Sequence, residues 1–309
     1  MKLALAGDTM LGRKVAEAIA ERGTDALVAD EVVAVAHEAD LFVLNLECCI
    51  SDRGERRREP GKPFFFRAPP AATAVLNRLG VDCVTLANNH ALDYGAEALL
   101  DTLAHLDAAG IAHVGAGADR ASARAPVTLQ AGGFRLAVLG CADHPRECAA
   151  GPQTPGIAYG LEWIDGAGDA DAVLVTPHWG PNMVAAPLTR IREAAARLRA
   201  AGATLVAGHS AHVFHGVEDG ILYDLGDFLD DYAVHRELRN DLGLLFLVEL
   251  DRAGLVRLEA VPLRLEFCHT RLAHGADAAW IRNRFVEACR DLGTEATEEQ
   301  GRLVVSWRE

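Results

Sequence analysis

Short apolar segments alternate with amphipathic segments along most of the chain. Apolar runs such as 2–6 and 41–44 have the length and composition of buried β-strands. The segments 11–22 and 94–109 place apolar residues three or four positions apart and are each followed by glycine, which is typical of helices. The same rhythm predicts strands at 82–86, 172–176 and 204–207, and helices at 71–79 and 189–201.

The pattern becomes richer in strands towards the C-terminus. A hairpin is predicted over 127–130 and 134–139, because Gly132 and Gly133 separate the two runs. Later runs predict strands at 221–223, 244–250, 255–260, 263–267 and 303–305, with a helix at 276–292. We therefore expect an α/β fold in which helices cover two mixed sheets. We expect one domain over 1–309, with a strand-rich part from about residue 240.

Composition narrows the class of protein. The 309 residues include 30 Lys and Arg against 44 Asp and Glu, a formal charge of −14, and half of the chain is hydrophobic. This mix indicates a folded globular protein, and the acidic balance argues against a broad nucleic-acid surface. The seven cysteines form no CxxC pair, and we find neither a secretory signal nor a membrane span. We expect a cytoplasmic protein with reduced cysteines and no membrane partner. The sequence carries no mark of its oligomeric state.

Polar side chains follow one predicted strand after another. They lie in the segments Gly7-Asp8, Asn45-Leu46-Glu47, Asn88-Asn89-His90, Pro177-His178 and Gly208-His209-Ser210-Ala211-His212. Ligand sites of α/β sheets lie beyond the carboxyl ends of the strands, so these side chains are expected to converge. Each cluster alone has a simpler explanation as a cap, a turn or a core histidine, but buried polar groups without partners are costly. Together they predict a divalent-metal centre, and the mixed nitrogen and oxygen ligands suit Mn, Zn or Fe.

These motifs resemble a known family. They are GDTMLGR at 7–13, NLE at 45–47, FRAPP at 66–70, ANNHALDYG at 87–95, HWG at 178–180, GHSAHV at 208–213 and LYDLGDF at 222–228. The chain is similar to bacterial capsule-synthesis proteins of the CapA type (poly-gamma-glutamate biosynthesis), a branch of the calcineurin-like metallophosphoesterase superfamily. The resemblance implies a four-layer α/β/β/α sandwich with a site for two divalent metal ions.

The resemblance also implies roles for individual residues. Metal ligands would be Asp8, Glu47, Asn89, His178, His209 and His212, with Glu47 bridging the ions. His90 would be the general acid that protonates the leaving group, and metals in such sites clamp phosphoryl oxygens and generate hydroxide. Arg13 has two explanations, one as a catalytic residue that stabilises the oxyanion and one as a structural ion-pair partner.

Several positions depart from the family pattern around this site. Met10 stands where the wider superfamily carries a second histidine ligand, and Ser210 and Ala211 replace a frequent His-Pro. Pro181 and Asn182 follow HWG in place of an acid. Three further changes are Asp224, Asp227 and His215, which are candidates for replacement ligands, for acid/base groups or for partners that orient the ligands.

Two other segments each have two explanations. The arginine-rich stretch 53–67, which includes Lys62, either binds an anionic substrate or is a solvated loop. Cys48-Cys49 is either a reactive thiol pair or buried strand filling.

Phosphoester hydrolysis is the reaction class that the expected site favours. The alternatives are metal-dependent acid/base or amide chemistry on a peptide or poly-gamma-glutamate-type substrate, and a non-catalytic family member. The expected partner is a small anionic or peptide-like substrate.

Overall fold

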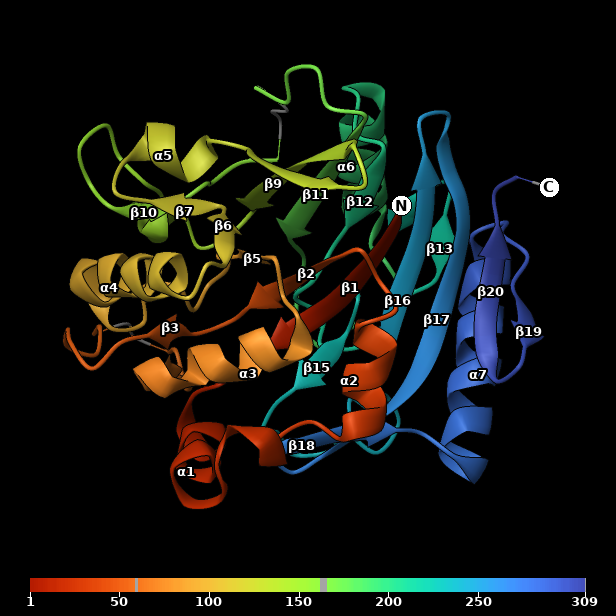
Figure 1. Cartoon of the computed structure of the whole chain (residues 1–309), viewed down its shortest axis with the longest axis horizontal. Coiled ribbons are helices and arrows are strands. Elements are labelled where there is room, and N and C mark those ends of the chain that lie inside the picture. The colour runs from red at the N-terminus through yellow and green to blue at the C-terminus, as the bar shows by residue number, and fades with distance from the viewer. Residues whose placement is uncertain (59–60, 162–165, 309) are drawn as a thin grey trace.

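The strands form two large mixed sheets. The computed structural model describes residues 1–58, 61–161 and 166–308. The larger sheet has the order β19-β20-β17-β16-β1-β2-β5-β6, with β15 paired to β1 and β18 paired to β17 (Figure 1). Its strands are β1 (Lys2–Thr9), β2 (Leu41–Leu46), β5 (Cys83–Thr85), β6 (Ala112–Val114), β15 (Asp227–Leu229), β16 (Leu242–Asp251), β17 (Gly254–Glu266), β18 (His269–Leu272), β19 (Thr297–Glu299) and β20 (Arg302–Ser306).

The smaller sheet has the order β13-β14-β12-β11-β9-β8. Its strands are β8 (Val127–Ala131), β9 (Phe134–Ala142), β11 (Ala172–His178), β12 (Leu205–Ala207), β13 (Val217–Glu218) and β14 (Ile221–Leu222). The predicted hairpin is present as the antiparallel pair β8 and β9. Two short ribbons pair β3 (Cys49–Ile50) with β4 (Arg67–Ala68), and β7 (Ala116–Gly117) with β10 (Gly156–Ile157).

The helices that the periodicity predicted are present. They are α1 (Arg13–Arg22), α3 (Thr73–Leu79), α4 (Gly95–Ala108), α6 (Thr189–Ala200) and α7 (Gly275–Asp291). Two short helices were not predicted, α2 (Asp30–Ala36) and α5 (Arg120–Arg124). The valines of α2 favour a strand when the segment is considered alone. Helix α5 has only one buried residue, Ala123, and begins with a capping box between Asp119 and Ser122. Single-turn helices precede or follow these at Thr24–Ala26, Pro70–Ala72 and Arg146–Cys148.

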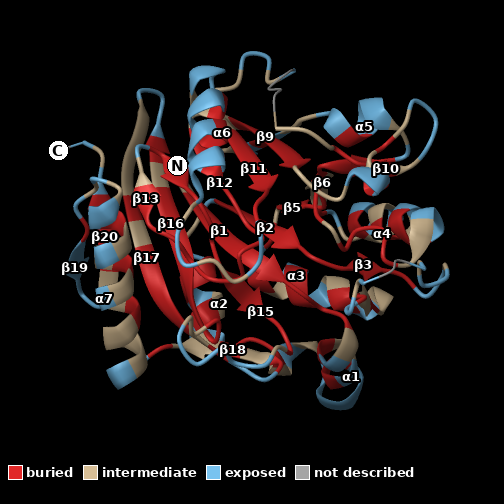
Figure 2. Cartoon of the chain, turned by 180° about the vertical axis from the view of Figure 1, so that it is seen from behind, coloured by how far each residue is buried: buried red, intermediate tan, exposed pale blue. Residues whose placement is uncertain are grey.

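The sheets and helices stack in four layers, which confirms the predicted α/β/β/α sandwich. Successive side chains of a strand point to opposite faces, so Leu3 and Leu5 of β1 pack between the two sheets, whereas Ala4 and Ala6 pack under helices α1–α4. On the far side, α6 covers the outer face of the smaller sheet with Ile191 and neighbouring residues. The central strands are therefore buried, whereas the edge strand β19 and the outward faces of α4, α5 and α6 are exposed (Figure 2).

The C-terminal strands belong to the large sheet, and one of them is longer than predicted. The segments 255–260 and 263–267 form a single strand, β17, that runs through Pro262. Proline has no N–H to donate, but the outer neighbour of β17 changes at this point. β20 pairs with Arg257–Ala260 and β18 with Leu263–Glu266, so Pro262 lies between the two ladders. A strand can thus continue through a residue that the sequence pattern reads as a break.

Within the described ranges, the structure has no helix with both the length and the apolar character needed to cross a membrane.

Candidate metal centre

The carboxyl ends of strands from both sheets converge on one site. In the large sheet, β1 and β2 run parallel and a register shift places Asp8 opposite Asn45. In the small sheet, β11 ends at His178, which forms an isolated parallel bridge with His209 just after β12. Both sheets therefore deliver polar side chains to the same end of the sandwich, as the sequence predicted.

Asp8, His178 and His209 form one group of possible ligands. Each residue offers an atom within 4.8 Å of those of the other two, and all three side chains are buried. The Nδ1 atoms of the histidines are 2.8 Å apart, and His209 Nδ1 is 3.9 Å from Asp8 Oδ1. Two imidazoles and a carboxylate at this spacing are ligands that Zn, Mn and Fe accept.

Asp8 also belongs to a second group, with His212 and Asp227. His212 Nδ1 lies 2.8 Å from Asp227 Oδ1 and 3.1 Å from Asp8 Oδ2. Asp227 is brought there by β15, which pairs in parallel with β1 so that Asp227 lies opposite Asp8. The resemblance had not placed Asp227 among the ligands.

Glu47 and Asn89 contribute oxygen atoms without partners. Both carboxylate oxygens of Glu47 are buried and, among the described residues, have no hydrogen-bond partner; Asn89 Oδ1 is in the same condition. Glu47 Oε1 is 3.8 Å from His178 Nε2, and the Nε2 atoms of His178 and His209 are likewise unpaired within the described part of the chain. Buried polar atoms without partners are costly, and a bound cation would satisfy them. The residues present therefore fit a divalent-metal site.

Burial and mutual charge shift the proton affinities of these groups. Burial, together with the charge of Asp8, raises the pKa of Glu47 well above its usual range. Burial lowers the pKa of His209 to about 4 and that of His178 well below its ordinary value. Burial opposes protonation of His212 as well, but Asp227 and Asp8 raise its pKa well above the ordinary value. His178 and His209 are thus neutral at pH 7, the form in which imidazole binds metals.

Two asparagines hold the carboxylate and the next loop together. Asn45 Nδ2 donates to Asp8 Oδ1 at 2.7 Å, and Asn88 Nδ2 donates to Asn45 Oδ1 at 2.9 Å. Asn88 Oδ1 in turn accepts from the backbone N–H of His90 at 3.0 Å. This chain of hydrogen bonds fixes the orientation of Asp8 and the start of the loop that carries Asn89 and His90.

On the other side of Asp8, the backbone of residues 7 and 8 packs closely against the backbone of Gly226. The N–H of Asp8 donates to the carbonyl of Gly226 at 2.9 Å, and a Cβ on Gly7 would lie 1.9 Å from the same oxygen. Asp224 accepts from the backbone N–H groups of Ala211 and Gly226, so it holds the turn that precedes β15. His215 contacts the carbonyl of Val184 through Nε2 at 2.9 Å. Of Asp224, Asp227 and His215, Asp227 is the one whose carboxylate directly contacts the side chain of a predicted ligand, His212.

His90 lies beside the predicted ligands and is held by Asp93. Its Nδ1 is 2.6 Å from Asp93 Oδ2, and the same oxygen accepts from the Phe66 N–H at 2.7 Å. The second oxygen of Asp93 forms an ion pair of 2.6 Å with Lys62 Nζ, which also donates to the carbonyl of Asn89. Burial lowers the pKa of His90, and the hydrogen bond to Asp93 opposes that shift.

Arg13 is held by a carboxylate and by aromatic rings. Its Nε is 3.2 Å from Asp231 Oδ2, and its guanidinium carbon lies 4.7 Å from the centre of the Phe64 ring and 5.4 Å from that of Phe66. These contacts fit the structural explanation of Arg13, whereas its Nη1 atom is buried without a hydrogen-bond partner among the described residues and fits a contact with substrate.

A cavity of about 440 Å3 opens beside His90 and Asn89. Phe64 and Tyr232 form an aromatic wall, and Lys62 and Asn182 supply polar groups. His144 also lines it, and the His144 ring centre is 5.1 Å from that of His178. His144 was not among the residues predicted from the sequence, although it follows the end of β9 as the predicted ligands follow other strands.

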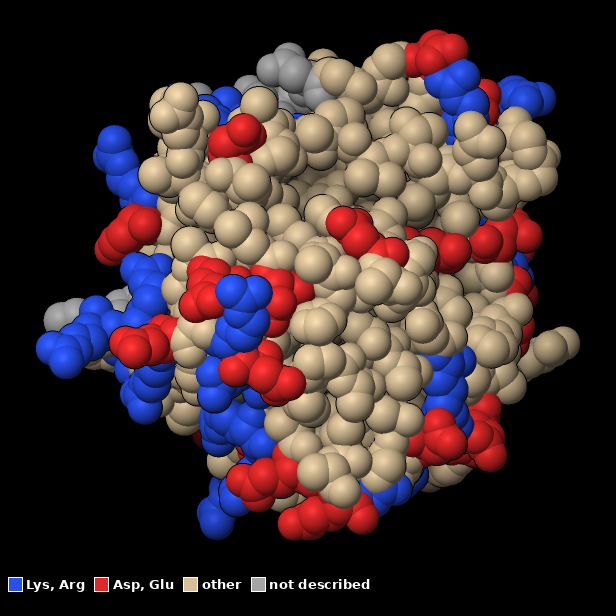
Figure 3. Space-filling view, turned by 60° about the vertical axis from the view of Figure 1, so that its left-hand side comes forward, with Lys and Arg blue, Asp and Glu red and all other residues tan. Residues whose placement is uncertain are grey.

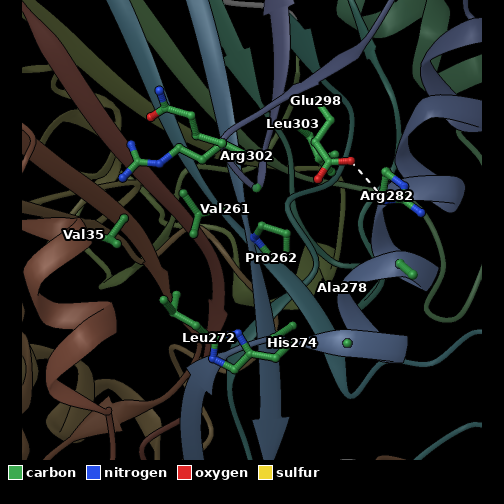
Figure 4. A pocket seen from close by; sticks show the side chains of 15 residues that line it. Val35, Val261, Pro262, Leu272, His274, Ala278, Arg282, Glu298, Arg302 and Leu303 are labelled. Atoms are coloured by element: carbon green, nitrogen blue, oxygen red, sulfur yellow. Dashed lines mark hydrogen bonds and ion pairs between the residues drawn. The ribbon is translucent and has the colours of Figure 1, made fainter.

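A second cavity, of about 450 Å3, lies at α7 and β17–β20 (Figure 4). Val261, Pro262 and Leu303 line it, and its charged groups are already paired. Arg282 Nη1 is 3.0 Å from Glu298 Oε2, and Arg302 pairs with Glu259 at 2.7 Å. This cavity presents no set of unpaired ligand atoms within the described residues, so the functional site is assigned to the strand ends.

Some residues of the basic stretch 53–67 fit the substrate-binding explanation and others fit the solvated-loop explanation. Lys62 lines the cavity beside His90, whereas Arg53 pairs with Glu97 and lies at the surface. Lys and Arg side chains are interspersed with Asp and Glu over the face shown in Figure 3, as solvated loops are. Glu59 of this stretch lies outside the described residues. Cys48 and Cys49 are buried, and burial raises the pKa of the Cys49 thiol to about 12, which favours strand filling over reactivity.

Comparisons with known proteins identify related sequences. The family model described as "Bacterial capsule synthesis protein PGA_cap" matches residues 2–232. A probable polyglutamine synthesis accessory protein of Mycobacterium tuberculosis is 32% identical over 297 residues, covering 86% of this chain and 76% of the relative. The PGA biosynthesis protein CapA of Bacillus subtilis is 28% identical, covering 83% and 70%, and the capsule biosynthesis protein CapA of Bacillus anthracis is 29% identical, covering 86% and 68%.

Among solved structures, a hypothetical protein from Thermus thermophilus has a similar fold. It aligns with a TM-score of 0.50 at 16% identity, over 85% of this chain and 99% of that protein.

Proposed function

The chain belongs to the bacterial capsule synthesis protein family PGA_cap, and from that membership and its buried ligand set we propose that it is a metal-dependent hydrolase acting on a phosphoester. The observation that carries the proposal is the convergence of unpaired ligand atoms from both sheets beside an open cavity. The proposed ligands are Asp8, Glu47, Asn89, His178, His209 and His212, to which we add Asp227.

The bound ions would supply Lewis-acid stabilisation of the phosphoryl oxygens and a nucleophile at neutral pH. The chain itself supplies the proton and the position of the substrate. Because Asp93 occupies Nδ1 of His90, the Nε2 atom is the one that exchanges a proton with the leaving oxygen. Lys62 orients Asp93 and places a positive charge on the cavity wall, which favours an anionic substrate. Arg13 positions Phe64 at the cavity through its pair with Asp231.

A second candidate reaction is hydrolysis or acid/base chemistry at a gamma-glutamyl amide. It is favoured by the names of the Bacillus relatives, which are PGA and capsule biosynthesis proteins. The same ions and the same His90 would serve a carbonyl in place of a phosphoryl group.

The test is a substrate screen on the full chain after loading with Mn, Zn or Fe. We expect hydrolysis of p-nitrophenyl phosphomonoesters or phosphodiesters that is lost on chelation and restored by metal. Turnover of gamma-glutamyl peptides alone would favour the second reaction. Absence of bound metal by elemental analysis, with no turnover of either class, would favour a non-catalytic member and overturn both proposals.

A further inference from the structure

Three arginines line a small cavity that the proposed reaction does not use. The cavity measures about 240 Å3 and is lined by Arg120 and Arg124 of α5 and by Arg146 of the turn Arg146–Cys148. Ala150 and the buried Ile157 also line it. Positions 120 and 124 are four residues apart on a helix, so both side chains emerge on one face.

Backbone carbonyls orient two of these guanidinium groups. Arg120 Nε donates to the carbonyl of Ala150 at 3.4 Å, and Arg124 Nη2 donates to the carbonyl of Tyr159 at 3.2 Å. For Arg120, the carbonyl fixes the guanidinium without cancelling its charge. Arg239, by contrast, forms ion pairs with Asp241 and Asp277. Across residues 1–58, 61–161 and 166–308, no carboxylate forms an ion pair with Arg120 or Arg146.

Arg120 and Arg146 thus place two positive charges, without a carboxylate partner among the described residues, in one concavity of a chain whose net charge is −14. Arginine presents planar N–H donors that match phosphate and carboxylate oxygens. An oxyanion would therefore gain charge-assisted hydrogen bonds from these two residues without displacing an existing ion pair.

The arginine cavity adjoins the cavity beside the metal centre. Pro145 and His144 line the latter, and Arg146, the next residue along the chain, lines the former. The segment 144–146 therefore contributes residues to both cavities. A ligand long enough to reach both would contact Lys62 and His90 at one end and the three arginines at the other.

We propose that the arginine cavity of Arg120, Arg124 and Arg146 binds a second anionic group, a phosphate or a carboxylate, of an extended substrate whose reacting group lies at the metal centre. The anion-binding step stands on the cavity alone. Its assignment to the substrate rests on the proposed function.

Binding is tested first without catalysis, by calorimetry on the metal-stripped full chain. The probes are tripolyphosphate and tri-gamma-glutamate, which distinguish a phosphate ligand from a carboxylate ligand. We expect the double variant Arg120→Gln/Arg146→Gln to bind the preferred probe at least about tenfold more weakly. The control is Arg197→Gln, which removes an exposed arginine of α6 and leaves binding unchanged. Equal affinity in the wild type and the double variant, or no binding of either probe to the wild type, would overturn the proposal.

The link to the substrate is tested by kinetics on the metal-loaded chain. For hexanediol bisphosphate, we expect the double variant to raise KM about tenfold with kcat unchanged. For p-nitrophenyl phosphate, which has one anionic group, KM should not change. An equal rise for both substrates, or for neither, would contradict the assignment to the substrate. If no variant and no wild-type sample hydrolyses a phosphoester, the proposed function fails and the calorimetric result still decides the cavity.

Discussion

The Nδ1 atoms of His178 and His209 lie 2.8 Å apart at the ends of adjacent parallel strands. This contact uses one nitrogen of each ring, and each Nε2 remains buried and unpaired within the described residues. Burial keeps both rings neutral by lowering their pKa values. Two neutral imidazoles with a carboxylate between the sheets make an arrangement that gains most from a cation.

We expect His209→Gln to weaken metal binding by at least about tenfold, since it removes a proposed ligand. Metal content per chain, measured by elemental analysis after dialysis against limiting Mn or Zn, would check this. His274→Gln is the control because His274 is exposed and outside the site. Undiminished metal content in His209→Gln would remove His209 from the ligand set.

Asp227→Asn tests whether Asp227 binds a metal ion, because the substitution removes the negative charge and keeps the size of the side chain. If Asp227 holds an ion with Asp8 and His212, the variant should bind one ion fewer, and the pKa of His212 should fall because a nearby negative charge is gone. Metal stoichiometry and the NMR titration of the His212 ring measure the two effects. Asp291→Asn is the control, since Asp291 is exposed at the end of α7 and outside the site. An unchanged stoichiometry would leave Asp227 as a partner of His212 alone.

His90→Ala should lower kcat by roughly 10²- to 10⁴-fold, the usual contribution of a general acid, and should leave the metal content intact. The chain neighbours of His90 are held by Asn88, whose bond is to the backbone N–H and survives the substitution. Turnover on the best phosphoester and elemental analysis of the same sample test both statements. Loss of metal in this variant would contradict the general-acid role.

Gly7→Ala should destabilise the fold and disturb the ligands together. The added Cβ would lie 1.9 Å from the Gly226 carbonyl, which is backbone and cannot swing aside, so we expect a cost of about 2–3 kcal/mol. Urea unfolding monitored by circular dichroism measures it. Gly275→Ala is the comparison, because no atom lies within 4 Å of a Cβ there and only its positive φ of 57° opposes the change, at about 1–2 kcal/mol. Equal costs in the two variants would refute the steric argument.

The burial of His215 leads us to expect that the protein loses stability in acid. Burial lowers its pKa from 6.5 to about 4, so the unfolded chain binds the proton more readily than the folded chain. The resulting stability is complete above pH 6.5 and is lost as the pH falls towards 4, and at pH 5 the loss is about 2 kcal/mol. His215→Gln keeps a donor for the Val184 carbonyl and cannot titrate. The fall in unfolding free energy between pH 7 and pH 5 should therefore be about 2 kcal/mol smaller in the variant than in the wild type. An equal fall would mean that His215 does not titrate in this range.

The sequence predicted the convergence of polar side chains that follow strands, because a strand end is a local pattern. Asp8 and His209 each stand directly after or near the end of a short apolar run, and parallel strands bring such ends to one edge. Asp227 depends on the pairing of β15 with β1, which joins residues more than two hundred positions apart. No local pattern contains that contact.

The role of Lys62 likewise could not be predicted from the local sequence. In the sequence it is one cation in a basic stretch, and only its burial against Asp93 distinguishes it from the exposed Arg53. Pro262 is an example from a strand. The proline is compatible with β17 because the outer partner of this strand changes there from β20 to β18, which the sequence pattern does not show. Tertiary neighbours, rather than the residues themselves, decide these cases.

The order of the strands has a consequence for how the protein matures. Asp8 emerges early in synthesis, but its neighbours in space include His178, His209 and Asp227, which emerge much later. β1 also stands between β2 and β16, so its sheet is incomplete until residues 242–251 have been made. A nascent chain thus carries the first ligand long before it carries a site. If the chain binds the proposed metal, its capture would come at the end of folding, and the metal content of a sample would measure how many molecules have finished folding.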